Sequence, residues 1–212
     1  MLVILTGHIQ LGKTRWLEAR LAELGLRGVE AWGVLTPGQW IAHEVDAEHP
    51  HGLEKVGIDM RFLPGGAERL YAVRADLSDM PGTSCTQVVG GAVMGWRFFD
   101  ERFEEANVLF STMRAMGKAS SVHAPADGDT RRIAVIDELG RLELERACPA
   151  GLTEALAFVQ DGPSAAFPHT VVIVRDFLLD AARAMFADCR PDGIAVISPD
   201  DAGRDALLSL FA

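Results

Sequence analysis

Four short apolar runs constrain the fold of this 212-residue chain more than any other feature. None of them alternates apolar with polar residues, which is the pattern of strands buried on both faces of a parallel sheet. Segments with helical spacing of apolar residues separate the runs, and strand–helix alternation of this kind predicts an α/β fold. The runs are LVIL at 2–5, RIAVID at 132–137, TVVIVR at 170–175 and GIAVIS at 193–198.

Helices are expected in the segments between and after these strands. Apolar residues recur at helical spacing in KTRWLEARLAELGLRG after the first strand, and over about 103–116 and 177–186. In the last segment, Asp200 or Asp201 can cap a helix whose apolar side faces the core. With helices on both faces, the central sheet is predicted to be mostly parallel.

The region at about 31–95 breaks this alternation. WGVLTPG is a strand candidate, and KVGIDMRFL with ERLYAVRA reads as an antiparallel hairpin around the turn PGG. The turn-rich segment ADLSDMPGTSCTQVVGG is expected to be irregular. We therefore expect a single domain over 1–212, with a β-rich insertion at about 31–95.

The stretch GHIQLGKT directly follows the first strand and fits the phosphate-loop pattern G-x-x-x-x-G-K-[ST]. Backbone N–H groups of such a turn, with the positive end of the next helix, point at an anion. Lys13 would reach the β and γ phosphates, and the Thr14 hydroxyl would bind Mg²⁺. The alternative is an ordinary turn without a ligand. The expected nucleotide-binding residues are Gly7, His8, Ile9, Gln10, Leu11, Gly12, Lys13, Thr14 and Arg15.

Residue usage bears on this loop in two ways. The chain has 20 Lys+Arg, but lysine occurs only at 13, 55 and 118, so a lysine in the required position carries weight. Gln10 stands where many such loops have a glycine, and its side chain restricts the turn. Gln10 is therefore expected to weaken nucleotide binding or to alter the geometry of the loop.

A second motif, RRIAVIDELGRLELE, places Asp137 and Glu138 after a buried strand. Ligands bind at the carboxyl ends of strands in open α/β sheets. Asp137 would hold the hydration shell of Mg²⁺ as the acidic partner of Thr14. Glu138 would orient or deprotonate the attacking water, a role worth about 10²–10⁴-fold in rate. The alternative is that these carboxylates only cap the following helix.

Charge and composition limit the partners. The net charge of −10 and the pI of about 5.0 argue against nucleic-acid binding and against binding to an anionic membrane surface. No apolar run approaches the roughly 20 residues of a membrane span, and no signal peptide is visible at the N-terminus. The three cysteines form no metal-type pair and are expected to be reduced thiols in a cytoplasmic protein. A protein partner is not readable from the sequence.

Taken with the hairpin between them, GHIQLGKT and IDELGRLEL resemble the THEP-type nucleoside-triphosphatases, a family of small P-loop proteins. The resemblance also includes GVLTPG and the C-terminal SPDDAGRDALL, and covers nearly the whole chain. It implies a Rossmann-like P-loop fold and slow, Mg²⁺-dependent hydrolysis of ATP and other nucleoside triphosphates. It also implies an arginine near the last helix, here Arg204, which would lie near the nucleobase. Arg15 departs from the family, where a second threonine is common.

Three further features have competing interpretations. Arg175 can stabilise charge in the transition state, or form a surface salt bridge with Asp176 or Asp180. The segment HEVDAEHPHG at 43–52 concentrates metal-binding residue types but lacks a helical i, i+4 pair. Trp96, Phe98 and Phe99 are expected to pack in the core, the alternative being a platform for a nucleobase.

Three functions remain open from the sequence. The first is a nucleoside-triphosphatase in which Glu138, Lys13 and Arg175 carry the reaction. The second is a nucleotide or nucleoside kinase, for which SSVHAPADGDTRR with Arg131 and Arg132 is the available lid. The third is a slow nucleotide-dependent switch or accessory protein. No N-K-x-D run supports guanine recognition of the GTPase kind.

Overall fold

The computed structural model describes most of the chain. The described residues are 1–8, 11–46, 51–77, 79, 81–89, 92–120, 131–145, 151–190 and 193–212. They form an α/β fold around one ten-stranded sheet with the order β10-β1-β9-β8-β2-β4-β5-β7-β6, in which β3 also pairs with β4.

One half of the sheet is parallel, and all four apolar runs lie in it. Strand β1 lies between β10 and β9, and β8 joins β9 to β2. Side chains of β1 alternate between two clusters, Leu2 and Ile4 on one face and Val3 and Leu5 on the other. Both faces are therefore buried, as the apolar runs predict. The strands are β1 (Leu2–Leu5), β2 (Val29–Leu35), β8 (Arg131–Ile136), β9 (His169–Ile173) and β10 (Ile194–Ile197).

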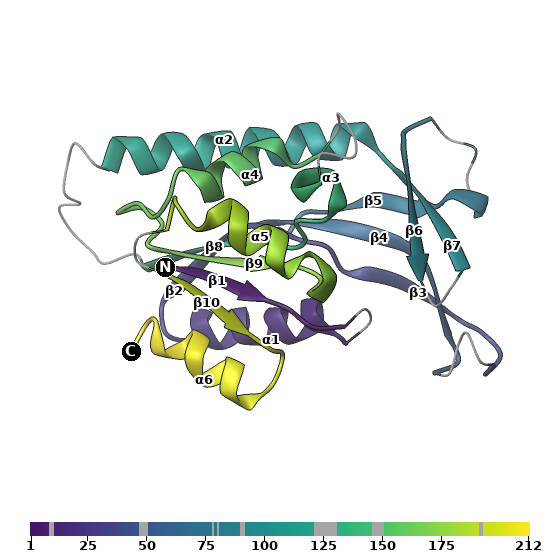
Figure 1. Ribbon diagram of the computed structural model, residues 1–212, viewed down its shortest axis with the longest axis horizontal. Helices are drawn as coiled ribbons and strands as arrows, with labels where there is room; N and C mark the ends of the chain where they lie inside the picture. The colour runs from purple at the N-terminus through teal and green to yellow at the C-terminus, as the bar shows by residue number, and fades with distance from the viewer. Residues whose placement is uncertain are drawn as a thin grey trace.

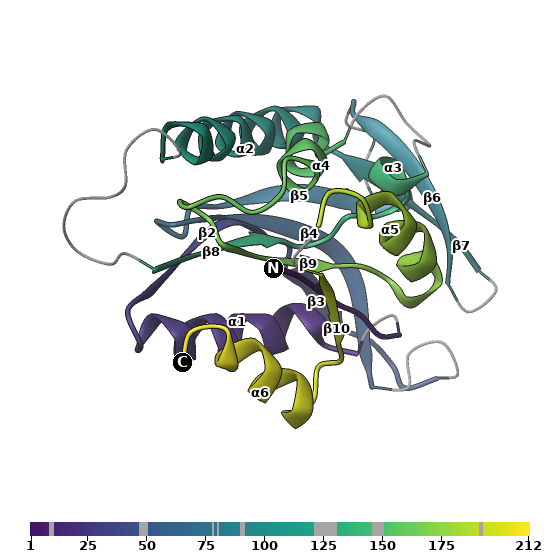
Figure 2. The ribbon, with the colours of Figure 1, turned by 60° about the vertical axis from the view of Figure 1, so that its left-hand side comes forward.

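Helices cover both faces of this half, as expected from the sequence (Figure 1). On one face lie α1 and α6, whose leucines pack against Val3 and Leu5. The other face is covered mainly by α2 and α4, with α3 and α5 beside them, as Figure 2 shows from a second direction. The bounds are α1 (Lys13–Gly25), α2 (Asp100–Ser120), α3 (Arg141–Leu144), α4 (Thr153–Gln160), η2 (Asp176–Leu178), α5 (Leu179–Phe186) and α6 (Asp201–Ser209).

The prediction of a mostly parallel sheet is wrong, because the other half is antiparallel. Strand β4 pairs antiparallel with β2, and β5, β7 and β6 follow in antiparallel order. The sheet is mixed because the chain between β2 and α2 returns in hairpins, which reverse direction at each turn. These strands are β3 (Gly38–Ala42), β4 (Leu53–Leu63), β5 (Glu68–Arg74), β6 (Thr83–Val89) and β7 (Ala92–Phe98).

Within this half, one predicted hairpin is confirmed and one irregular segment is not. Strands β4 and β5 pair as the sequence predicts. The segment at 75–91 was expected to be irregular, but after η1 (Ala75–Leu77) it forms β6, which pairs with β7 from Thr83 opposite Phe98 onward. Figure 1 shows β3, β6 and β7 beyond the end to which β1 points. The antiparallel half therefore extends past the carboxyl ends of the parallel strands.

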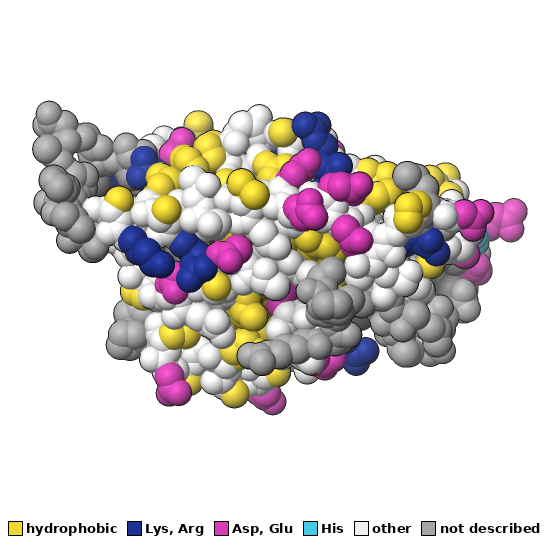
Figure 3. Space-filling model, turned by 90° about the horizontal axis from the view of Figure 1, so that it is seen from above, with side chains coloured by type: hydrophobic (Ala, Val, Ile, Leu, Met, Phe, Trp, Pro, Cys, Tyr) yellow, Lys and Arg dark blue, Asp and Glu magenta, His cyan; other side chains and the backbone are white. Residues whose placement is uncertain are grey.

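The outer face of α2 and α4 carries mixed charge. Figure 3 shows acidic and basic side chains next to one another there, with apolar side chains between them. Arg114 on α2 bonds Glu154 and Asp161 from α4 and its C-terminal end. No helix in the described part of the chain is long and apolar enough to cross a membrane.

Candidate functional site

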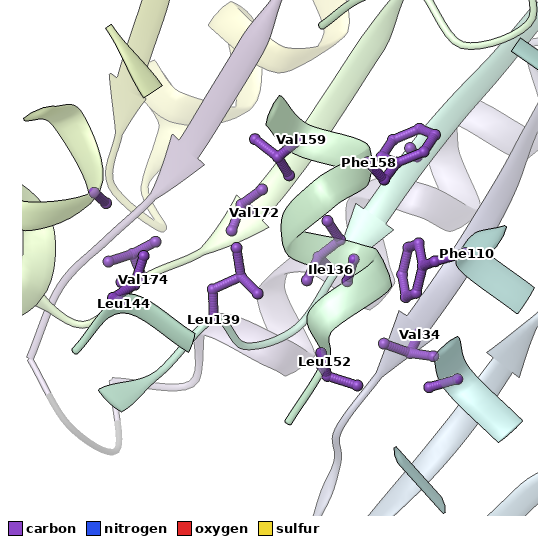
Figure 4. Close-up of a cluster of buried hydrophobic side chains, with 14 of the residues drawn as sticks. Val34, Phe110, Ile136, Leu139, Leu144, Leu152, Phe158, Val159, Val172 and Val174 are labelled. Carbon is purple, nitrogen blue, oxygen red and sulfur yellow. The ribbon is translucent and has the colours of Figure 1, made fainter. Parts of the chain in front are cut away.

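The acidic pair Asp137–Glu138 is anchored in the core on both sides. Ile136 before it and Leu139 after it are fully buried in the same hydrophobic cluster (Figure 4). The Leu139 N–H donates to the Ile173 carbonyl at 3.1 Å, so the chain leaving β8 is held against the end of β9. The two carboxylates therefore leave the sheet at a fixed place, its carboxyl edge.

Asp137 is buried, with 2% of its surface exposed. Its Oδ2 accepts a hydrogen bond from the Thr36 N–H at 3.0 Å, and the hydroxyls of Thr14 and Thr36 bond the same carboxylate. Burial raises the pKa of Asp137 to about 6, although these hydrogen bonds favour the charged form. Thr14 begins α1 and Thr36 follows β2, so Asp137 connects three segments of the site.

The loop after β1 folds back on its own lysine. The Lys13 ammonium donates to the carbonyl oxygens of Gly7 at 2.8 Å and of His8 at 2.7 Å. Gly12 has a φ of 76°, a left-handed conformation that favours glycine, and directly precedes α1. Ile9 and Gln10, two of the predicted binding residues, lie outside the described residues. The predicted effect of Gln10 lies outside them too.

Lys13 is buried among the charges of the acidic motif. Burial is the main cause that lowers the pKa of its ammonium, and Arg175 lowers it further. Glu138, Asp176 and Asp137 act in the opposite direction. These couplings place the loop lysine within electrostatic reach of the residues that follow β8 and β9.

Glu138 forms an ion pair with Arg175, which lies two residues beyond the end of β9. Arg175 Nε lies 2.5 Å from Oε1 of Glu138, and Nη2 lies 3.5 Å from Oε2. The salt-bridge partners expected for Arg175 from the sequence were Asp176 or Asp180, but the structure pairs it with Glu138. Asp176 instead pairs with His8 of the loop at 2.6 Å, which joins the loop to the end of β9.

Lys55 on β4 lies near the site but was not expected there from the sequence. Burial lowers the pKa of its ammonium, and the charges of Glu138, Arg175 and Asp137 shift it as well. Its Nζ lies 5.3 Å from the centre of the Trp96 ring. It begins the predicted strand KVGIDMRFL, but neither the phosphate-loop motif nor the acidic motif contains it, and the one signal for a site is its rarity as one of three lysines.

No described contact joins the acidic pair to Arg204, Arg15 or Leu11, which were also predicted to bind the nucleotide. Arg204 on α6 bonds Glu23 of α1, with Nε 3.0 Å from Oε2. Arg15 is exposed on the first turn of α1, and Leu11 is exposed in the loop. Their predicted roles in nucleotide binding therefore have no support from contacts within the described residues.

The arginines proposed for a kinase lid begin β8, whereas the acidic pair follows its end. Arg132 precedes Asp137 by five residues of extended chain, which spans about 16 Å. Arg131 donates to the Phe211 carbonyl, and Arg132 lies over the Trp32 ring. The segment 121–130 itself lies outside the described residues. The two arginines are thus engaged at the opposite edge of the sheet.

The Glu143 carboxylate is used to hold the backbone in place. Its Oε2 accepts from the Gly140 N–H and its Oε1 from the Leu152 N–H, both at 2.9 Å. Burial raises the pKa of this carboxyl. Both oxygens are thus used to hold the chain after the acidic pair against the start of α4.

The remaining alternatives from the sequence concern core packing and metal binding. Trp96 and Phe98 are buried in the main hydrophobic cluster, so their predicted packing role is confirmed, whereas Phe99 is half-buried and is not part of this cluster. Among the described residues, no group of three or more His, Cys, Asp or Glu could hold a metal ion. Glu48 and His49 of the histidine-rich segment lie outside that set. Cys189 is a free thiol.

The chain has no match among models of protein families, curated proteins or solved structures. The site must therefore be interpreted from its own residues.

Proposed function

We propose that this protein is a Mg²⁺-dependent nucleoside-triphosphatase of the P-loop type. One observation carries the proposal: Lys13, Asp137, Glu138 and Arg175 leave the carboxyl ends of three parallel strands and lie within electrostatic reach of one another. A phosphate chain needs cations and oriented N–H groups, and its hydrolysis needs a carboxylate near the attacked phosphorus. The two motifs supply both kinds of group at one edge of the sheet.

Lys13 is suited to bind phosphate oxygens. An ammonium has three N–H donors, and two of them bond the carbonyls of Gly7 and His8. These bonds fix the lysine inside the loop and leave one donor for a phosphate oxygen. The amino end of α1 adds N–H groups and positive potential to the same place.

Thr14 and Asp137 fit a magnesium site that a nucleotide completes. Their side chains are hydrogen-bonded to each other at the edge of the sheet. Mg²⁺ in nucleotide sites takes one or two protein oxygens, with phosphate oxygens and water supplying the rest. Bound there, the ion would neutralise charge on the β and γ phosphates.

Glu138 is suited to act on the attacking water. Hydrolysis joins the water oxygen to the terminal phosphorus and breaks the bond from that phosphorus to the bridging oxygen. One proton of the water passes to the Glu138 carboxylate, and the nucleoside diphosphate leaves with the bridging oxygen. Arg175 binds mainly Oε1 of Glu138, which leaves Oε2 to accept from water, and its guanidinium can stabilise the charge that develops.

Nucleotide-dependent stabilisation of the protein tests this proposal. ATP, GTP, CTP and UTP are added with Mg²⁺, and the melting temperature is measured for the wild type, Lys13→Ala and the remote control Lys118→Ala. A ligand at 100 times its dissociation constant stabilises by about 2.7 kcal/mol. We expect this gain for the wild type and Lys118→Ala, its loss in Lys13→Ala, and its reduction without Mg²⁺. A wild type that none of the four nucleotides stabilises contradicts the proposal.

A further inference from the structure

Lys55 is a half-buried cation for which the described residues supply no anionic partner. No hydrogen bond or ion pair joins its ammonium to any described residue, and the ammonium lies over the face of the Trp96 ring. Burial lowers the pKa of this ammonium. Partial withdrawal of a cation from water without a paired anion costs free energy, so such a position is a candidate for a group that meets its partner in a bound ligand.

A second donor lies beside it. Trp40 is the cross-strand neighbour of Lys55 in the β3–β4 pairing. Gly38 leaves room for both side chains, since a Cβ at that position would lie 2.8 Å from Cε of Lys55 and 2.8 Å from Nε1 of Trp40. No described residue accepts a hydrogen bond from the Trp40 indole. A cation and an N–H donor, both without acceptors, therefore share one place.

This place adjoins the proposed reaction site. The charges of Glu138 and Asp137 raise the pKa of Lys55, and the charge of Arg175 lowers it, so all three act on the ammonium. Along the chain, Gly38 is two residues after Thr36, whose N–H binds Asp137. The antiparallel half of the sheet thus brings Lys55 within electrostatic reach of the carboxylates.

The other two cations of the site already have partners. Lys13 donates to loop carbonyls, and Arg175 pairs with Glu138. The charges of Glu138 and Asp137 act on both lysines, Lys13 in the phosphate loop and Lys55 on β4.

We propose that Lys55 and Trp40 bind the terminal phosphate of the nucleotide, so that Lys55 distinguishes a triphosphate from a diphosphate. This inference rests on the proposed function. The ligand group is a phosphate in either case, but two sources exist: the nucleotide itself, or a second anionic molecule that accepts phosphate. The coupling to Glu138 favours the terminal phosphate, since the water that Glu138 orients must attack that group.

Calorimetric titration separates these possibilities. The titrants are Mg-ADP, a non-hydrolysable Mg-ATP analogue and, as the second anionic ligand, inorganic phosphate added to the Mg-ADP complex. The proteins are the wild type, Lys55→Met and Lys118→Met. Methionine keeps the length of the side chain and removes its charge. We expect Lys55→Met to bind the ATP analogue about tenfold or more weakly and ADP within about twofold of the wild type. Lys118→Met, which lacks the third lysine, should bind both like the wild type.

Two further variants test the geometry. Trp40→Phe keeps an aromatic ring and removes the N–H donor. It should weaken binding of the analogue alone, by about two- to tenfold. Gly38→Ala should displace the end of the Lys55 side chain, because that end is flexible and the strand is not. It should likewise weaken binding of the analogue and leave binding of ADP unchanged. Apo melting temperatures show whether each variant is folded. Lys55→Arg keeps a charge and should recover part of the affinity for the analogue.

Each remaining outcome is decisive. If Lys55→Met binds the analogue as the wild type does, the inference is wrong while the proposed function stands. If Lys55→Met loses affinity for ADP and for the analogue equally, or loses affinity only for a second anionic ligand, the assignment to the terminal phosphate is overturned. If the wild type binds neither nucleotide, the proposed function fails and this inference fails with it.

Discussion

Arg175 lies against Glu138, with Nε 2.5 Å from Oε1, and this ion pair joins the end of β9 to the end of β8. The pair is only partly exposed, with 20% of the arginine side chain and 25% of the glutamate side chain accessible. It fixes the direction in which each side chain points. In the proposed reaction, it sets Glu138 for the water and Arg175 for the phosphate.

Replacing Arg175 should therefore affect turnover more than binding. We expect Arg175→Ala to lower single-turnover hydrolysis by at least about 10²-fold and to leave Mg-ADP affinity within a few fold of the wild type. Arg175→Lys should recover only part of the rate, because lysine lacks the planar fork of the guanidinium. The control is Arg183→Ala, an exposed arginine on α5. An Arg175→Ala variant within threefold of the wild-type rate would exclude this role.

Asp137 should matter chiefly for magnesium. Asp137→Asn keeps an oxygen for the Thr36 N–H but removes the charge near the ion. We expect the gain in ATP affinity that Mg²⁺ provides to fall by about 10- to 100-fold, with little change in affinity measured in EDTA. Titrations with and without Mg²⁺ measure this gain directly. An unchanged gain in Asp137→Asn would show that this carboxylate does not serve the ion.

Glu143 should contribute to stability rather than to chemistry. Glutamine has one carbonyl oxygen, so Glu143→Gln leaves either the Gly140 N–H or the Leu152 N–H without an acceptor. We expect the free energy of unfolding to fall by about 1–3 kcal/mol and the hydrolysis rate at a permissive temperature to stay within about threefold. Glu145→Gln, at the exposed end of the same helix, is the control. A large loss of rate without a loss of stability would instead make Glu143 a catalytic residue.

A pH effect on stability is expected at the α2–α4 contact. The hydrogen bond from Arg114 is the main cause that lowers the pKa of Asp161. A carboxyl whose folded pKa lies below its unfolded value stabilises above the unfolded pKa, and this contribution is lost as pH falls through the folded pKa.

We therefore expect Asp161→Asn to be less stable than the wild type at pH 6–7, by at most about 1 kcal/mol because the pair is exposed. The difference should shrink as pH falls below about 4. Thermal melts over this range provide the measurement, with Glu104→Gln on α2 as the control. A difference that grows toward low pH would contradict this sign.

The sequence predicted the parallel half of the sheet because its strands are buried on both faces. Continuous apolar runs identify such strands without knowledge of their neighbours. The same runs predicted where Asp137 and Glu138 leave the sheet, since polar residues follow the last buried position. The position of Arg175 after β9 follows in the same way. Its pairing with Glu138 does not, because side-chain direction depends on tertiary contacts.

The antiparallel half was harder to predict, because its strands are only partly buried. TSCTQVV is rich in Thr and Val and precedes a Gly-Gly pair, which is a hairpin signal that the turn-rich residues before it obscured. Lys55 could not be assigned to the site from sequence, since it reaches Glu138 only through the pairing of β4 in the mixed sheet. Local patterns therefore predicted the strands and motifs, but not the contacts made by long-range pairing.

Release of labelled γ-phosphate from Mg-ATP, under single-turnover conditions, tests the central claim most directly. The proteins are the wild type and Glu138→Gln. Glutamate and glutamine have nearly the same shape, but only glutamate has the carboxylate that orients water. The account predicts hydrolysis by the wild type without an acceptor, a loss of about 10²-fold or more in Glu138→Gln, and near-equal nucleotide affinity in both. Equal hydrolysis by the two proteins, or transfer of the label to an added nucleoside or nucleotide in place of release, would contradict it.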